Sequence, residues 1–134
     1  MISKKNFYRY AKEASKEPGC WLLRISDTSF LIEFHIEGYP IGVEVVRAKR
    51  FVGIDIYNFP QKYVTNGFLQ YTSGYKIEKV PRLIELVRDY LIENGGFEAT
   101  KKRERESKTY YSFAEYCARH DQSVFTEEGI FKYV

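Results

Sequence analysis

The chain has 134 residues, close to the usual size of one domain; 44% of them are hydrophobic and 29% are charged. Its formal net charge of +3 is too small to indicate nucleic-acid binding by itself, and it argues against an acidic mimic of DNA. No apolar run approaches the length of a membrane span, and the first basic residues precede no apolar segment, so we expect neither a membrane segment nor a signal peptide. Two isolated cysteines, Cys20 and Cys117, favour reduced thiols and a cytoplasmic protein.

The first part of the chain predicts one helix and the beginning of a sheet. Residues 3–16 place apolar side chains at helical spacing behind Ser3, a favourable N-cap, and Pro18-Gly19 is expected to end the helix. Alternating apolar and polar residues then predict strands at 20–26, 29–37, 41–47 and 51–57. Residues 48–50 are interpreted as a break between the last two strands, with one bulged continuous strand as the alternative.

Two of these strands carry specific expectations about their faces. In 29–37 every second residue from Phe30 onward is apolar, which predicts one row facing the core and the other facing outward. In 20–26 we expect Trp21, Leu23 and Ile25 to share one face.

The remaining chain predicts a strand, a long helix and a helical tail. Residues 58–74 are open between a short helix and another strand, and 75–80 is expected to be a strand. Residues 81–93 form the most strongly patterned helix, with Pro81 in its first turn and glycines after its end. Residues 97–109 are a charged connector, either an exposed helix or a linker, and 110–134 are expected to be a helical appendage.

These elements predict a single domain of the α+β class. Its mostly antiparallel, four- to five-stranded sheet would be covered by the helices at 3–16 and 81–93. Residues 1–96 would form the core, residues 97–109 the connector, and residues 110–134 a short helical tail packed at an edge or on the second face of the sheet.

Aromatic residues are unusually abundant, with 12 Tyr, 10 Phe and one Trp, together 17% of the chain. Tyrosine is apolar with one polar tip, so it serves equally in a core, on a sheet face or on a binding surface. The abundance therefore permits a binding role without establishing one.

Acidic residues and a histidine lie on one face of the strand at 29–37. Glu33, His35 and Glu37 alternate along it, and Glu44 is able to join them across a hairpin. Such a group is suited to a divalent metal, but the same pattern is typical of the solvated face of an antiparallel sheet. We therefore predict no metal and no cofactor.

The order of elements over residues 3–93 resembles the core of the PD-(D/E)XK nucleases. The resemblance implies that a carboxylate on the second strand and a Glu-x-Lys on the third hold Mg²⁺ and activate water. Asp27 or Glu33 would be the first carboxylate and Glu44 the second. Val46 occupies the position of the lysine, and Lys49 follows at a spacing that should place it on the other face.

Basic residues form three clusters along the chain. Five Lys or Arg against one Glu lie in the first sixteen residues, a second cluster follows the third predicted strand, and a third lies near residue 102. Together with nearby tyrosines they are suited to a phosphate backbone and to stacking on bases. The binding residues that we predict are Arg47, Lys49, Arg50, Tyr57 and Lys102.

Three functions follow from these patterns. The first is a non-catalytic protein that binds a protein or nucleoprotein partner stoichiometrically, in the style of phage or mobile-element inhibitors of host defence such as anti-CRISPR proteins. The second is a nucleic-acid-binding module, which requires the basic clusters to converge in the fold. The third is a degenerate or active PD-(D/E)XK-like nuclease, which requires its carboxylates to meet in one cleft.

Overall fold

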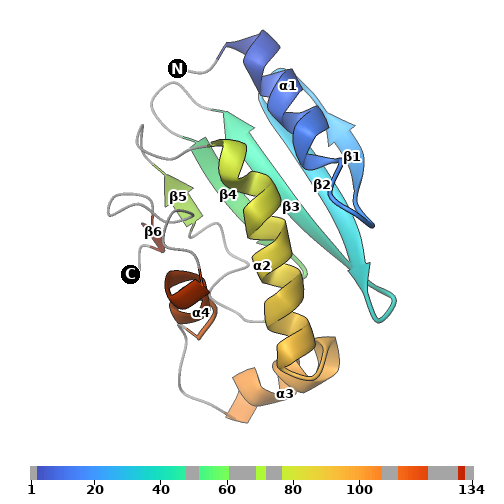
Figure 1. The fold of residues 1–134 in the computed structure, drawn as a ribbon, viewed down its shortest axis with the longest axis vertical. Helices are drawn as coiled ribbons and strands as arrows, with labels where there is room; N and C mark the ends of the chain where they lie inside the picture. Colours follow the sequence, from blue (N-terminus) through green and yellow to red (C-terminus); the bar gives the residue numbers. More distant parts are fainter. Residues whose placement is uncertain are drawn as a thin grey trace.

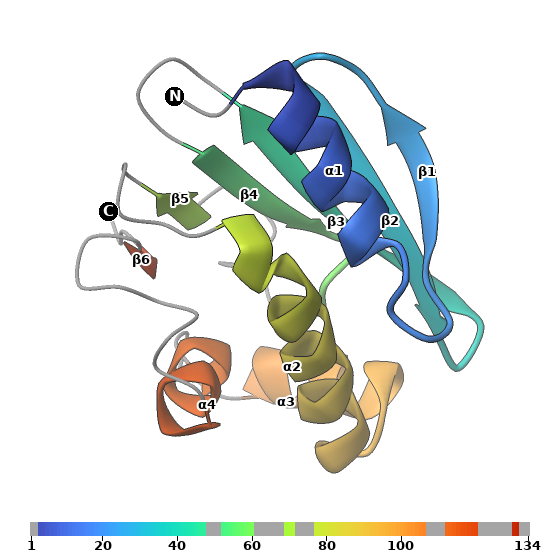
Figure 2. The same ribbon diagram turned by 45° about the horizontal axis from the view of Figure 1, so that its top comes forward.

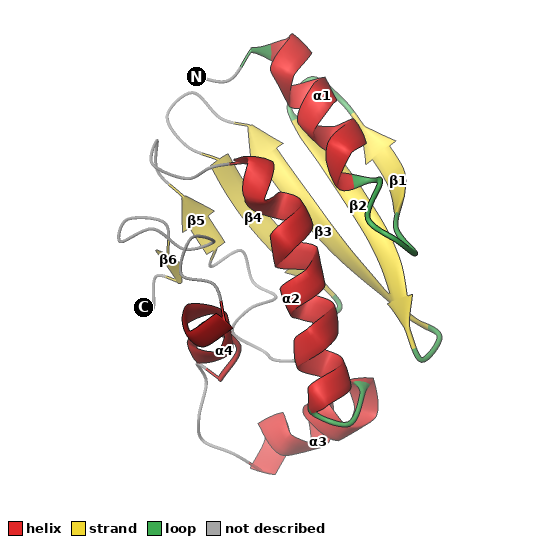
Figure 3. Cartoon of the chain, in the orientation of Figure 1, coloured by secondary structure: helices red, strands yellow, loops and turns green. Residues whose placement is uncertain are grey.

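The computed structural model describes residues 3–47, 52–60, 69–71, 77–106, 112–120 and 130–131. The helices are α1 (Lys4–Ala14), α2 (Val80–Glu93), α3 (Phe97–Glu106) and α4 (Ser112–His120), with a 3₁₀ turn η1 (Ile77–Lys79) ahead of α2. The strands are β1 (Trp21–Ile25), β2 (Ser29–Ile36), β3 (Tyr39–Arg47), β4 (Val52–Tyr57), β5 (Leu69–Tyr71) and β6 (Ile130–Phe131). They form one antiparallel sheet in the order of the sequence, which confirms the predicted α+β class (Figures 1 and 3).

Strand β2 organises the sheet because its alternation of side chains sends one row into the core. Phe30, Ile32 and Phe34 are fully or almost fully buried on the inner face, as predicted. A two-residue turn joins β2 to β3, and both of its residues have positive φ, 53° at Glu37 and 81° at Gly38. Such a turn twists in the sense of the flanking strands and thereby fixes their register.

Helices α1 and α2 lie side by side on one face of the sheet (Figures 1 and 2). The side chain of Ser3 accepts a hydrogen bond from the backbone N–H of Asn6 at 3.2 Å, which confirms the predicted N-cap of α1. Both helices turn their apolar stripes toward the sheet, so Phe7 of α1 and Leu83 of α2 belong to the same buried cluster as the inner face of β2.

Helix α4 belongs to this same helical layer. The ring of Phe113 lies 4.9 Å from that of Phe59 and 5.3 Å from that of Tyr90 on α2. Of the two predicted positions, the second face is therefore wrong for α4, which packs against α2 on the helical side (Figure 2). None of the helices in the described ranges is long and apolar enough to cross a membrane.

The sequence interpretation is wrong at two further elements. Residues 77–80 are not a strand, because Ile77, Val80 and Leu83 recur at helical spacing and are all buried against the core as η1 and α2 begin. Ile130–Phe131 is not helical, because it pairs with β5, an interaction with a distant segment that no local pattern reports.

The third and fourth strands are separate elements. Arg47 pairs with Val52 and Gly42 with Tyr57, so β3 and β4 run antiparallel as neighbours. This excludes the alternative of one bulged continuous strand. The three residues between them, 48–50, lie outside the described residues.

Candidate functional site

The sheet has one face under the helices and one face turned away from them. The name open face is used here for the outward-pointing side chains of β1–β4, which the strand register places on the side opposite the core. They are Trp21, Arg24, Leu31, Glu33, His35, Glu44, Val46, Asp55 and Tyr57. Among the described helices, α1, α2 and α4 all lie on the other side of the sheet (Figure 2).

A hydrogen-bonded group crosses the centre of the open face. Arg24 donates to Oε2 of Glu44 at 2.9 Å, and the hydroxyl of Tyr57 donates to Oε1 of the same carboxylate at 2.9 Å. Glu44 is therefore held from two sides, and its side chain is only 14% exposed. The donated hydrogen bond to this carboxylate raises the pKa of Tyr57.

This group covers an apolar centre. Leu31 lies between Arg24 and Glu44 in the register, so the bridge between those two side chains passes over it. Leu31 is only 8% exposed although it points away from the core. Gly42 makes room for it, because a Cβ at that position would lie 2.9 Å from Cδ1 of Leu31.

Two exposed aromatic side chains flank that centre. Trp21 on β1 is 40% exposed and packs edge-on against the ring of His35, with the ring centroids 5.1 Å apart. Tyr57 on β4 is also 40% exposed. Large aromatic side chains in this position contribute apolar contact area at a small cost in conformational entropy.

The open face is acidic. Its carboxylates belong to Glu33, Glu44 and Asp55, and among the described residues of this face the guanidinium of Arg24 is the matching cation. The protein as a whole carries a formal net charge of +3. Among the described residues, most of the cations lie away from the open face.

Part of that positive charge lies at the N-terminal end of α1. Lys4 forms an ion pair with Asp27 at 2.9 Å, and the hydroxyl of Tyr8 donates to the same carboxylate at 3.2 Å. The hydrogen bond from Lys4 holds the pKa of Asp27 below its usual value. Arg47 joins them from the end of β3, with its guanidinium 5.6 Å from the centroid of the Phe7 ring.

The structure separates Asp27 from Glu44, whereas Glu33 and Glu44 share the open face. Asp27 is engaged with Lys4 and Tyr8 at the end of the sheet, whereas both oxygens of Glu44 accept hydrogen bonds on the open face. Glu33 lies one row from Glu44, opposite Gly42. Within the described ranges, no group of three or more His, Cys, Asp and Glu is arranged to hold a metal ion.

The predicted binding residues do not form one patch in the described structure. Arg47 lies beside α1 on the helical side, Tyr57 lies on the open face, and Lys102 is exposed on α3 at the opposite end of the molecule from the end of β3 (Figure 1). Lys49 and Arg50 lie outside the described residues. Arg47 and Lys102 are therefore far apart. Their two basic clusters do not converge among the described residues, although the nucleic-acid hypothesis requires convergence.

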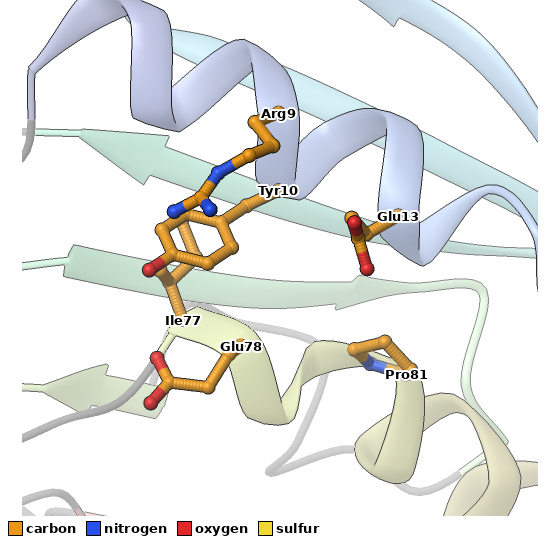
Figure 4. A pocket seen from close by; sticks show the side chains of 6 residues that line it. All are labelled: Arg9, Tyr10, Glu13, Ile77, Glu78 and Pro81. Carbon is orange, nitrogen blue, oxygen red and sulfur yellow. The ribbon is translucent and has the colours of Figure 1, made fainter.

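A pocket of about 140 Å³ lies between α1 and the start of α2 (Figure 4). Its lining residues are Arg9, Tyr10, Glu13, Ile77, Glu78 and Pro81. The guanidinium of Arg9 lies over the ring of Tyr10, 5.0 Å from its centroid. Pockets for small-molecule ligands are commonly roughly 300–1,000 Å³, so this one is smaller than a usual ligand site.

Sequence reasoning missed the outer row of β1. A bulge at Leu23 puts one extra residue between Leu22 and Arg24, so the alternation reverses there. Trp21 and Arg24 consequently face outward while Ile25 faces inward, and the expectation that Trp21, Leu23 and Ile25 share a face is wrong. Gly42 within a strand was the available signal of a close approach on that face.

The chain matches no protein-family model, no curated protein and no solved structure. Its function is therefore argued from the two surfaces that the fold separates, the acidic and aromatic open face and the basic side of the helical layer.

Proposed function

We propose that this protein is a non-catalytic binding module whose open face docks onto a protein partner. The observation that carries the proposal is the centre of that face, where Arg24, Glu44 and Tyr57 form a fixed hydrogen-bonded group over the buried Leu31. A preorganised surface loses little side-chain entropy when a partner binds.

The composition of the open face fits a protein. Trp, Tyr and Arg are the residues that most often dominate the energy of protein interfaces, and Trp21, Tyr57 and Arg24 all project from these strands. Val46 adds exposed apolar surface beside them. The partner that complements this face presents apolar side chains surrounded by Lys or Arg.

The charge of the open face disfavours two other occupants. Phosphates of a nucleic acid would be repelled by Glu33, Glu44 and Asp55, because like charges brought together across an interface are costly. A second copy of the chain docked through the same face would bring together two surfaces of the same net charge. A different protein with a basic surface avoids both penalties.

Site-specific photocrosslinking tests this proposal. A benzophenone amino acid replaces Val46 on the open face, and in a matched variant it replaces Ile92, which is 64% exposed on α2. Each variant is expressed in the source cell or its host and irradiated. We expect a protein adduct from position 46 that position 92 does not give, and we expect Trp21→Ser in the same chain to abolish it.

The proposal is wrong if position 92 captures the partner and position 46 does not, or if Trp21→Ser leaves the adduct unchanged. An adduct between two copies of this chain would also contradict the proposal, because it would indicate self-association. Sedimentation of the purified protein checks that outcome independently. The identity of the adduct also tests the narrower prediction that the partner is a component of host defence.

A further inference from the structure

Helix α1 carries a line of cations on the side away from the sheet. Lys5, Arg9 and Lys12 recur at intervals of four and three residues, and Lys16 continues the line in the turn after the helix. All four side chains are exposed, and they are called the basic ridge here. At 1.5 Å per residue the ridge spans about 16 Å.

Only part of the basic ridge is favourable for the helix that bears it, because Lys12 lies in the last turn, where the helix dipole favours a cation, and Lys5 lies in the first turn, where it does not. Its neighbouring cations are three or four residues apart, a spacing at which like charges repel. The first turn contains no acidic residue, although the positive end of the helix dipole favours one there. The ion pair at this helix belongs to Lys4, and in the described part of the chain Lys5, Lys12 and Lys16 have no acidic partner.

The chemistry of the ridge selects its ligand. Lysine is depleted at protein interfaces, where aromatic and apolar side chains supply the energy, and the ridge has neither. A membrane surface would require an apolar face to insert, but the apolar residues of α1, Phe7, Ala11 and Ala14, are fully buried in the core. The phosphodiester backbone of a nucleic acid is a repeating line of negative charge. It matches a line of lysines and needs neither aromatic contacts nor an apolar face that inserts.

We propose that the basic ridge of α1 contacts the phosphate backbone of a nucleic acid, independently of sequence. The ridge and the open face lie on opposite sides of the molecule, because α1 covers the inner face of the sheet (Figure 2). The two surfaces are therefore able to act at the same time. A nucleoprotein, with a basic protein surface and an adjacent nucleic acid, presents both of the complementary charges.

Binding to labelled mixed-sequence DNA duplex and to single-stranded RNA, measured across a salt series, tests the ridge. The ridge variant combines Lys5→Gln, Lys12→Gln and Lys16→Gln, which leaves Arg9 in place over Tyr10. The matched control combines Lys101→Gln, Arg103→Gln and Arg119→Gln, whose side chains are exposed on α3 and α4. Both variants remove three positive charges, so a difference between them reports position and not net charge.

We expect the wild-type affinity for at least one of the two nucleic acids to fall steeply with salt. In the ridge variant the slope of log affinity against log salt should decrease by about 3, roughly one per lysine, while the control keeps the wild-type slope. The ridge variant should unfold close to the wild-type temperature, because the like-charge repulsion that is removed offsets the lost interaction of Lys12 with the helix dipole. Trp21→Ser should bind nucleic acid as the wild type does, which separates this inference from the proposed function of the open face.

Three results would overturn the inference. The first is the absence of salt-dependent binding of the wild type to both nucleic acids. The second is an equal loss in the ridge variant and the control, which would make the effect one of net charge. The third is binding of heparin or of vesicles containing anionic lipid with no binding of nucleic acid, which would assign the ridge to a different polyanion.

Discussion

Replacing Gly96 by alanine tests how the helical layer is attached to the sheet. Gly96 connects α2 to α3 with φ of +103°, a conformation that L-amino acids rarely adopt. A Cβ added there would lie 2.5 Å from Cδ of Glu37 and closer still to its Oε1. The carboxylate end of Glu37, an exposed and flexible side chain, would therefore have to move away from the connection between the helices.

The expected loss of unfolding free energy has two parts, which a comparison with Gly19 helps to separate. The backbone strain alone costs about 1–2 kcal/mol, as it would at Gly19, which has φ of +74° and no heavy atom within 4 Å of an added Cβ. Moving the end of the exposed Glu37 side chain adds a smaller further cost, so we expect a total of about 1.5–3 kcal/mol for Gly96→Ala. That is a large share of the roughly 5–15 kcal/mol by which domains are stable.

Urea unfolding of Gly96→Ala, Gly19→Ala, Glu37→Ala and the double variant Glu37→Ala/Gly96→Ala measures these parts. Gly96→Ala should lower the free energy of unfolding by more than Gly19→Ala does. The double variant should recover part of that difference, because the clash is gone while the strain remains. Equal losses of unfolding free energy at the two glycines would refute the contact of Glu37 with this connection. The same conclusion would follow if the double variant lost as much unfolding free energy as its two single variants together, or more.

The remaining predictions concern the cap, the core and two titrating groups. Ser3→Ala should cost about 1 kcal/mol in urea unfolding because it removes the N-cap of α1. Phe30→Ala should cost about 3–5 kcal/mol, since its ring is fully buried 5.1 Å from that of Phe7. Burial and Glu93 raise the pKa of Tyr116 to about 12, so this hydroxyl contributes stability below its unfolded pKa that is lost as pH rises through the folded one. Wild type should therefore lose stability more steeply above about pH 10 than Tyr116→Phe. Asp27 has a lowered pKa, so its contribution is present above its ordinary pKa of 3.8 and is lost as pH falls through the folded value. Acid unfolding of Asp27→Asn, followed by circular dichroism, should accordingly be less steep than that of the wild type below that pH.

Elements whose pattern is local could be predicted from the sequence. The alternation of β2 and the apolar stripe of α2 each report the face that is buried, because a single strand or helix contains the whole pattern. Strand β1 was predicted, but the assignment of its faces was wrong. One bulged residue, Leu23, shifts the register without leaving a signature in so short a segment. Strand β6 was wrongly predicted to be helical, because its formation depends on a partner strand about sixty residues away in the chain.

The centre of the open face was beyond sequence reasoning for a related reason. Arg24, Leu31 and Glu44 lie on three successive strands, and only the combined register of two strand pairs puts them in one row. Tyr57 was singled out as a binding residue for its nearness to basic residues in sequence, yet in the fold its hydroxyl meets a carboxylate. Residues that are close in sequence are thus poor guides to spatial neighbours in a sheet, because successive side chains along a strand point to opposite faces.

The small net charge of the protein conceals a separation of charge that the fold creates. A strand with a period of two and a helix with a period of 3.6 each sort their side chains by face, and α1 is stacked on the inner face of the sheet. The carboxylates of the open face and the lysines of the ridge consequently point in opposite directions. Because opposite charges on opposite sides cancel in the sum but not in the local field, a net charge near zero is compatible with two strongly charged surfaces. A partner that carries both a basic protein surface and a phosphate backbone would be oriented by this arrangement before any contact forms.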